Sequence, residues 1–276
     1  MPGAIRKGEN MKEKVLELIK AKGLDVEITS KQRNNVIKEG IIFKNDSPAP
    51  IIYFPSNMDE MNEEEVAEKI LDMYKDAKNS KINFDPEMLK NGKIKPCVCN
   101  TAINKDFLNT VIHKDLPFGL SVYYRIWLNN EVSTVITPQI LKYLNLTNND
   151  VFKYKDKYSV KKLIEFIEEN LGFPCPIPAD AEQPPVYIVY NDNCNFAAAV
   201  LSDDTALKGI SDIFEGNDFY ILPSSVHEVL VCEKSSFMNP RELQDIVMSI
   251  NSTELRPEDF LSDDIFVYHQ GMISVA

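Results

Sequence analysis

Residues 219–231, FYILPSSVHEVLV, predict two short strands separated by a turn. The expected strands, Phe219–Leu222 and Val226–Val231, are rich in the aromatic and β-branched residues that favour extended backbone. Pro223 and the two serines between them are turn formers. The sequence on both sides extends this unit into a larger α+β pattern.

Four further strands are expected in the C-terminal part of the chain. They are Val186–Tyr190, Phe196–Leu201 and a final hairpin of Ile265–Tyr268 and Met272–Val275. One helix is expected to end near Phe214. A second begins at Asn239, a good N-cap residue that is followed by Pro240 at the first helical position. The order is ββαββα followed by ββ, which is typical of an α+β fold.

The N-terminal part also mixes helices and strands. The spacing of apolar residues predicts a helix over Met11–Lys22. Asn62 and Glu65 form a capping-box pattern at the start of a second helix. The apolar stripe of that helix is expected to consist of Val66, Ile70, Met73 and Ala77. Later helices are expected to begin at Thr137 and at Ser159. The strands expected over Asp25–Ser30, Val36–Lys44 and Pro50–Phe54 suggest an antiparallel meander. Two further strands are expected at Leu120–Leu128 and Val132–Ile136.

A proline-rich stretch, Gly172 to Pro185 (GFPCPIPADAEQPP), predicts the main boundary of the chain. Proline fixes φ and removes a backbone donor, so this stretch is expected to be a stiff, extended connector. It divides the chain into an N-terminal lobe, residues 11–171, and a C-terminal lobe, residues 186–276. The sequence therefore predicts two α+β lobes of mainly antiparallel sheet with packed helices.

Composition restricts the function more than it reveals it. The 276 residues are 44% apolar and carry a net charge of −12, with 42 acidic and 30 basic side chains. An acidic chain repels phosphate, so no direct nucleic-acid binding is expected. No apolar run is long enough to span a membrane and the first ten residues lack the apolar core of a secretion signal, so a cytoplasmic location is expected.

Cofactor and metal motifs are absent from the sequence. The ten glycines form no phosphate-binding loop, and the three histidines are too scattered to nominate a zinc site. No cofactor and no metal are therefore expected. Cys97 and Cys99 share one face of an expected strand, where they either coordinate a soft metal, exchange a disulfide, or, as we favour, act as small buried hydrophobes. The odd cysteine count favours reduced thiols.

The segment Ser224-Ser225-Val226-His227-Glu228 brings together a hydroxyl, an imidazole and a carboxyl group, the chemical types that activate a nucleophile. On a strand, Ser225 and His227 share one face and Glu228 lies on the other, so Glu228 is poorly placed to orient the imidazole. A distant acid, such as Asp218 or Asp264, is an alternative partner. We favour a structural role for the segment and assign no catalytic residue. Ser224, Ser225, His227 and Glu228 remain the candidates.

The same region carries a family resemblance. Residues 218–230, DFYILPSSVHEVL, together with Arg33-Asn34-Asn35, Gly40-Ile41-Ile42 and residues 49–54 (APIIYF), resemble blocks of an uncharacterised family of bacterial proteins common in anaerobic gut Firmicutes. The order of the blocks also agrees, over nearly the whole chain from Met11. The resemblance implies a cytoplasmic bacterial protein and brings no reaction, ligand or catalytic residue.

Two positions depart from the family pattern. Val36 and Phe196 stand where the family usually has glycine. Glycine adopts a positive φ most easily, so the sequence itself does not predict a positive φ at either position.

These observations favour a non-enzymatic interaction protein that binds a protein or peptide partner. Its acidic surface suggests a variant in which it mimics a nucleic acid. The alternatives are a hydrolase that uses Ser225 or Ser224 as nucleophile with His227 as base, and a small-ligand-binding protein. The hydrolase requires His227 to lie beside a pocket, within hydrogen-bond reach of a serine hydroxyl and oriented by an acid.

Overall fold

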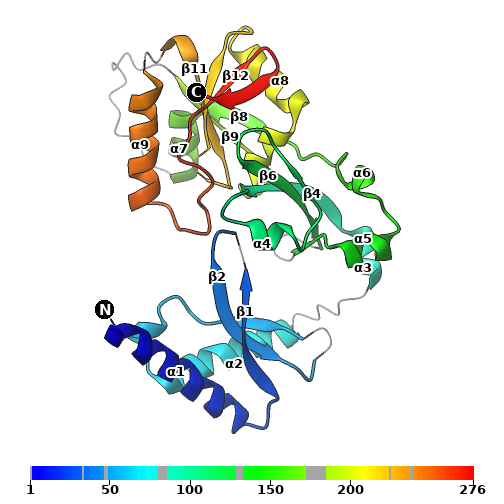
Figure 1. Ribbon diagram of the computed structural model, residues 1–276, viewed down its shortest axis with the longest axis vertical. Helices are drawn as coiled ribbons and strands as arrows, with labels where there is room; N and C mark the ends of the chain where they lie inside the picture. The colour runs from blue at the N-terminus through cyan, green and yellow to red at the C-terminus, as the bar shows by residue number, and fades with distance from the viewer. Residues whose placement is uncertain are drawn as a thin grey trace. The chain divides into compact units, whose positions relative to one another are not determined.

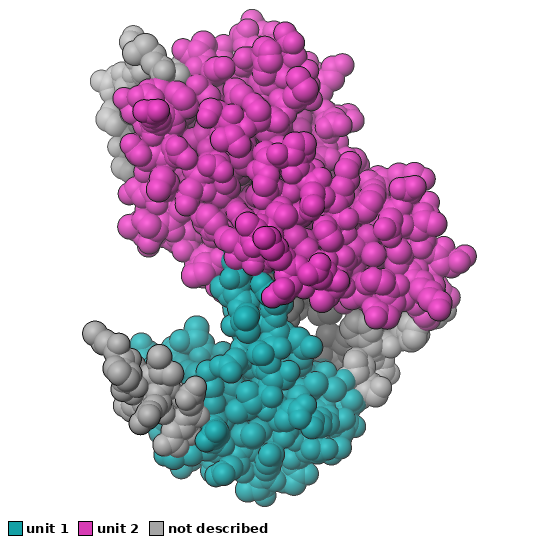
Figure 2. All heavy atoms as spheres, viewed as in Figure 1, with its two compact units in different colours: residues 1–88 teal, residues 89–276 magenta. Residues whose placement is uncertain are grey.

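The computed structural model describes residues 2–32, 34–46, 49–79, 86–128, 133–171, 185–223, 225–236 and 239–276. The chain forms two compact units, residues 1–88 and 89–276, which are coloured separately in Figure 2. Both combine helices with antiparallel sheet, so the predicted α+β class is confirmed.

Unit 1 contains a three-stranded antiparallel meander and two helices, one before and one after the meander along the chain, that pack on each other (Figure 1). Its elements are α1 (Pro2–Lys20), β1 (Val26–Gln32), β2 (Ile37–Phe43), β3 (Ile51–Tyr53), the 3-10 turn η1 (Met58–Glu60) and α2 (Glu63–Asn79). The meander is as predicted, and α1 begins at Pro2 rather than at Met11.

The core of unit 1 forms where α1 and α2 cover the meander. Asn62 and Glu65 cap α2 reciprocally, because each side chain accepts a hydrogen bond from the other residue's backbone N–H, at 2.9 and 3.0 Å. Met73 is 44% exposed, so the predicted apolar stripe is wrong at that position. Tyr74 is buried in its place, and its ring stacks on Phe43 at a centroid distance of 3.7 Å.

Unit 2 begins with a four-stranded sheet in which β6 is central. Strands β4 and β5 pair with opposite sides of β6, and β7 also pairs with β6. The elements are α3 (Pro86–Asn91), β4 (Lys93–Asn100), α4 (Lys105–Leu108), β5 (His113–Asp115), β6 (Leu120–Trp127), β7 (Ser133–Val135), α5 (Pro138–Leu144) and α6 (Asn148–Val151).

A six-stranded antiparallel sheet, in the order β13-β12-β10-β11-β9-β8, forms the rest of unit 2 (Figure 1). Its elements are β8 (Ser159–Lys162), α7 (Leu163–Leu171), β9 (Val186–Tyr190), η2 (Ala197–Ser202), α8 (Asp204–Ile213), β10 (Phe219–Leu222), β11 (Val229–Glu233), η3 (Lys234–Ser236), α9 (Pro240–Thr253), β12 (Phe266–His269) and β13 (Met272–Val275). Alternate residues of its strands face two different apolar layers.

The first layer joins the six-stranded sheet to the four-stranded one. Val98 and Val122 of the smaller sheet share a core with Ile221 and Val231 of the larger sheet. On the opposite face of the larger sheet, α9 packs Leu243 and Val247 over the strands.

The compact units divide the chain at a different place from the predicted lobes. The expected connector over 172–185 lies outside the described residues, except for Pro185. Strand β8, which precedes it, pairs antiparallel with β9, which follows it. Residues on both sides therefore belong to one sheet. The boundary between the two compact units falls instead between Met88 and Leu89 along the chain.

Three local predictions in unit 2 need correction. Ser159 begins the strand β8 and does not cap a helix, because α7 starts only at Leu163. Residues 197–202 form the 3-10 helix η2, where three consecutive alanines offer little strand preference. Strand β11 begins at Val229 rather than at Val226.

Gly40 provides a test of packing in unit 1. A Cβ atom at this position would lie 2.5 Å from the backbone oxygen of Ile52 on the neighbouring strand. We expect Gly40→Ala to lower the free energy of unfolding of unit 1 by about 1–3 kcal/mol, because β2 and β3 must move apart. Calorimetry, with hydrogen exchange of residues 26–43, measures the change.

The matched control is Gly209→Ala on α8, where an added Cβ meets nothing within 4 Å. There alanine should leave stability unchanged or raise it by up to about 1 kcal/mol, because it favours the helix. Equal effects of the two substitutions would contradict the close strand contact.

Candidate functional site

A cavity of about 350 Å³ lies between α7 and the six-stranded sheet. Helix α7 lies on the same face of that sheet as α9 (Figure 1), since Leu230 contributes to the core under α9 and to the cavity under α7. Most of its lining is apolar or aromatic, and its polar groups come from two loops. The lining residues are Leu163, Phe166, Ile167, Ile188, Tyr190, Cys194, His227, Glu228 and Leu230.

Helix α7 supplies one wall of the cavity. Leu163, Phe166 and Ile167 are spaced i, i+3 and i+4, so they share one face of the helix. The ring of Phe166 packs on that of Tyr190 at a centroid distance of 4.8 Å. The helical spacing of these three residues could have indicated an apolar helix face from the sequence. No neighbouring residue indicates that this face lies over β9.

The polar end of the cavity is formed by the turn before β11. Glu228 lies two residues before Leu230 and shares its face of the sheet, so both line the cavity. Burial raises the pKa of the Glu228 carboxyl above its ordinary value, against the smaller lowering effects of a hydrogen bond from Ser225 and the nearby His227. The carboxyl is therefore easier to keep neutral than one in water.

His227 is oriented by an acid that the sequence did not nominate for this role. Its Nε2 atom lies 3.0 Å from Oδ1 of Asp259, whose Oδ2 accepts a 2.7 Å hydrogen bond from Arg256. Because a carboxylate only accepts, Nε2 carries the proton and Nδ1 of a neutral ring is an acceptor. Nδ1 is buried and has no hydrogen-bond partner within the described residues.

The two acids considered from sequence lie elsewhere. Asp218 contacts His269, with 2.7 Å between Oδ1 and Nδ1, and the backbone N–H of Asp264 donates to Ser262. Asp259 reaches His227 because its segment pairs with the turn. Its backbone carbonyl accepts from the N–H of Val226 at 2.9 Å.

Ser225 is placed differently from a nucleophile on a histidine base. Its Oγ accepts the backbone N–H of His227 at 2.9 Å and hydrogen-bonds to Glu228. The other candidate, Ser224, lies outside the described residues. Of the three features that a hydrolase requires, His227 has the neighbouring cavity and the acid, whereas its ring is not paired with the Ser225 hydroxyl.

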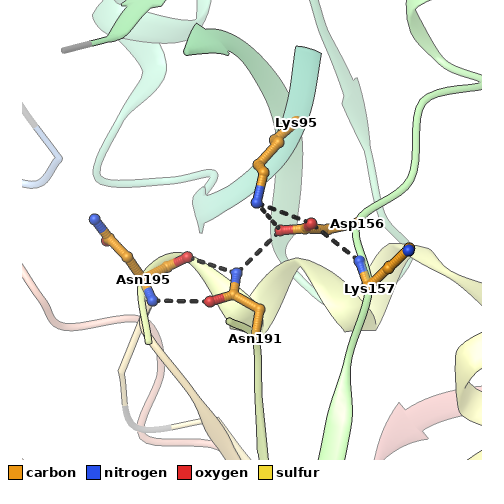
Figure 3. A network of polar contacts seen from close by, with 5 residues as sticks. All are labelled: Lys95, Asp156, Lys157, Asn191 and Asn195. Atoms are coloured by element: carbon orange, nitrogen blue, oxygen red, sulfur yellow. Dashed lines mark hydrogen bonds and ion pairs between the residues drawn. The ribbon is translucent and has the colours of Figure 1, made fainter. Parts of the chain in front are cut away.

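A polar network holds the loop after β9, which carries Cys194 to the cavity (Figure 3). The buried Asn191 side chain donates to Asp156 at 3.0 Å and to the backbone oxygen of Asn195 at 2.8 Å, and it accepts from the N–H of Asn195. Lys95 pairs with the same carboxylate at 3.0 Å. The network therefore links β4, the segment before β8 and the loop after β9.

The last residue of that loop, Phe196, has a left-handed backbone with φ of 58°. The glycine-like conformation thus exists at a position where the chain has no glycine. A left-handed non-glycine residue is strained by about 1–2 kcal/mol. Contacts with three side chains offset this strain, since the ring lies 5.6 Å from His227, 6.3 Å from Trp127 and 5.8 Å from the Arg125 guanidinium.

The two cysteines of strand β4 do not line this cavity. Cys97 and Cys99 are fully buried, and burial raises the pKa of each thiol to about 12. Such thiols are poor nucleophiles at neutral pH. Within the described ranges, no group of three or more histidine, cysteine or carboxylate side chains is arranged to hold a metal ion. In the same part of the chain, no helix combines the length and apolarity needed to cross a membrane.

Comparison with known protein families identifies the family of this chain. A model of a family of unknown function matches residues 8–270. The chain belongs to that family, DUF5688. Neither the curated proteins nor the solved structures contain a significant match. The family supplies no reaction, so the chemistry of the cavity must be argued from its residues.

The Asp259 contacts give a stability test. We expect Asp259→Ala to lower the free energy of unfolding by about 1–3 kcal/mol, because it leaves the Nε2–H of His227 without its acceptor. Arg256→Ala should change stability little, because the Arg256 side chain is 70% exposed and solvent replaces its contact. Urea unfolding of the two variants compares them, and equal losses would contradict a specific role of the His227 contact.

The raised pKa of Glu228 gives a pH test. Because the folded state holds this proton more tightly than the unfolded chain, the carboxyl lowers stability as pH rises through its folded pKa. We expect Glu228→Gln to raise the free energy of unfolding near pH 7.5 and to change it little near pH 4. Urea titrations at both pH values measure the difference. An equal gain at the two values would show that burial of the charge is not its cause.

Proposed function

We propose that this protein is a non-enzymatic binding protein that recognises a protein or peptide partner. The cavity between α7 and the six-stranded sheet accepts an anchoring side chain of that partner. The observation that carries the proposal is the lining, in which six apolar or aromatic side chains surround a small polar end formed by His227 and Glu228. Binding pockets commonly have this composition.

The packing of α7 supports the same interpretation. Leu163, Phe166 and Ile167 form the apolar face of the helix, yet they line open space over the sheet. Burial of this surface by a ligand would release water from it, which is favourable at about 25 cal/mol per Å². The binding free energy therefore has a clear source.

The position of Ser225 favours binding over hydrolysis. Its hydroxyl hydrogen-bonds to the His227 backbone and to Glu228, so the imidazole has no described hydroxyl to activate. The acidic character of the chain, −12 overall, supports the variant in which the protein occupies the nucleic-acid site of a basic partner.

Filling the cavity tests the proposal. We expect peptides selected from a displayed random library on the full chain to bind an Ile167→Trp variant at least tenfold more weakly, because the indole occupies the space of the anchor. Isothermal titration calorimetry measures both affinities. The control is Ile246→Trp on α9, which enlarges a side chain that is 55% exposed and does not line the cavity.

Circular dichroism checks that both variants are folded. Peptides that bind all three proteins equally would place the binding surface elsewhere. A library that yields no binders, together with binding of a small apolar molecule lost in Ile167→Trp, would replace the peptide with a small ligand.

A further inference from the structure

The polar end of the cavity offers hydrogen-bond acceptors. Glu228 lines it with a carboxyl group, whose oxygens accept hydrogen bonds, and His227 lines it next to Glu228. A carboxyl group in a partly buried site is matched by a ligand group with several donors and a positive charge. An ammonium or guanidinium group has both properties.

The apolar walls are suited to the stem of such a group. Long basic side chains bury their methylene chains against apolar surface while the charged end reaches a polar partner. Leu163, Ile188 and Leu230 provide such a surface, and the rings of Phe166 and Tyr190 are close enough together, at 4.8 Å, to form one aromatic wall. Aromatic faces also attract cations.

The charge around the site has the complementary sign. Residues 185–276, which supply five of the six strands and the whole turn before β11, contain fifteen acidic and four basic side chains, a net charge of −11. By contrast, residues 89–171 contain eight acidic and twelve basic side chains, a net charge of +4. A field of this sign concentrates basic partners near the C-terminal segment and speeds their encounter.

We infer that the cavity binds a long basic side chain, a lysine or an arginine, presented by a positively charged segment of the partner. The methylene stem packs against α7 and the sheet, and the charged end pairs with Glu228. This inference rests on the proposed function and adds the chemistry of the anchor. It also gives the buried carboxyl a role, because a cationic ligand stabilises its ionised form.

Three probes of one shape test the inference. The full chain is titrated with 4-phenylbutylamine, 4-phenylbutanol and 4-phenylbutyrate at pH 7.5, and binding is followed by the amide NMR signals of Ile188 and Leu230. We expect the amine to bind at least tenfold more tightly than the alcohol, and the acid to bind most weakly. In Glu228→Gln the amine should fall to the affinity of the alcohol, while the alcohol is unaffected.

Asp245→Asn is the matched control, because it removes one negative charge from an exposed residue of α9 that does not line the cavity. The amine preference should survive this change. Equal binding of amine and alcohol to the unmodified chain, or a preference that persists in Glu228→Gln, would overturn the inference and leave the cavity as an apolar site. If none of the three probes shifts these signals, or if Ile167→Trp binds them all unchanged, the cavity itself is not the binding site and the proposed function fails with it.

Discussion

A six-stranded sheet buried on both faces is the constraint on which unit 2 depends. One face packs against the smaller sheet, with Ile221 and Val231 in a core that reaches Val98 and Val122. On the opposite face, the described residues place α9 and α7 over the strands. Helix α9 packs closely through Leu243 and Val247, whereas α7 leaves a cavity over β9 and β11. The candidate site is thus the part of this face that the described residues leave unfilled.

Loops at one edge of the cavity are held by polar contacts rather than by apolar packing. Asn191 uses both amide hydrogens and its carbonyl oxygen on Asp156 and Asn195, and Asp259 holds His227 while its backbone pairs with Val226. These bonds fix the turns before η2 and β11 against each other, since the N–H of Ala197 donates to the carbonyl oxygen of His227 at 3.0 Å. Loops held by this many hydrogen bonds can keep Phe196 in its strained, left-handed backbone conformation.

The sequence predicted those structural features that depend on residues close together along the chain. The caps at Asn62 and Asn239, the meander of unit 1 and the hairpin of β12 and β13 each follow from local spacing and turn chemistry. It did not predict η2 in place of a strand, because the fate of Ala197 and Ala198 is decided by hydrogen bonds to the distant residues His227 and Val226. The pairing of β8 with β9 spans the proline-rich stretch, so a boundary drawn from local composition could not include it.

The candidate site shows the same division between local and distant information. The residue types of Ser225, His227 and Glu228 drew attention to the correct turn. Side-chain alternation wrongly placed His227 and Glu228 on opposite faces, because both precede the strand β11 and both line the cavity. The acid that orients His227 remained hidden, because Asp259 is 32 residues away and reaches the ring only through the pairing of two irregular segments. Helix α7 completes the cavity. It lies near β9 because β8, the strand directly before α7, pairs with β9, and no sequence motif indicates this position.

The Glu228 carboxyl is the feature that folding alone explains least. Its burial raises its pKa, so ionisation at neutral pH lowers the stability of the folded chain, and the hydrogen bond from Ser225 offsets only part of that cost. A glutamine would fill the same space without the charge. A carboxyl group kept in a mostly apolar cavity is costly in the free protein and favourable once a cation enters. The same residue that weakens the fold would therefore strengthen binding, which is the balance expected of a recognition site rather than of a structural core.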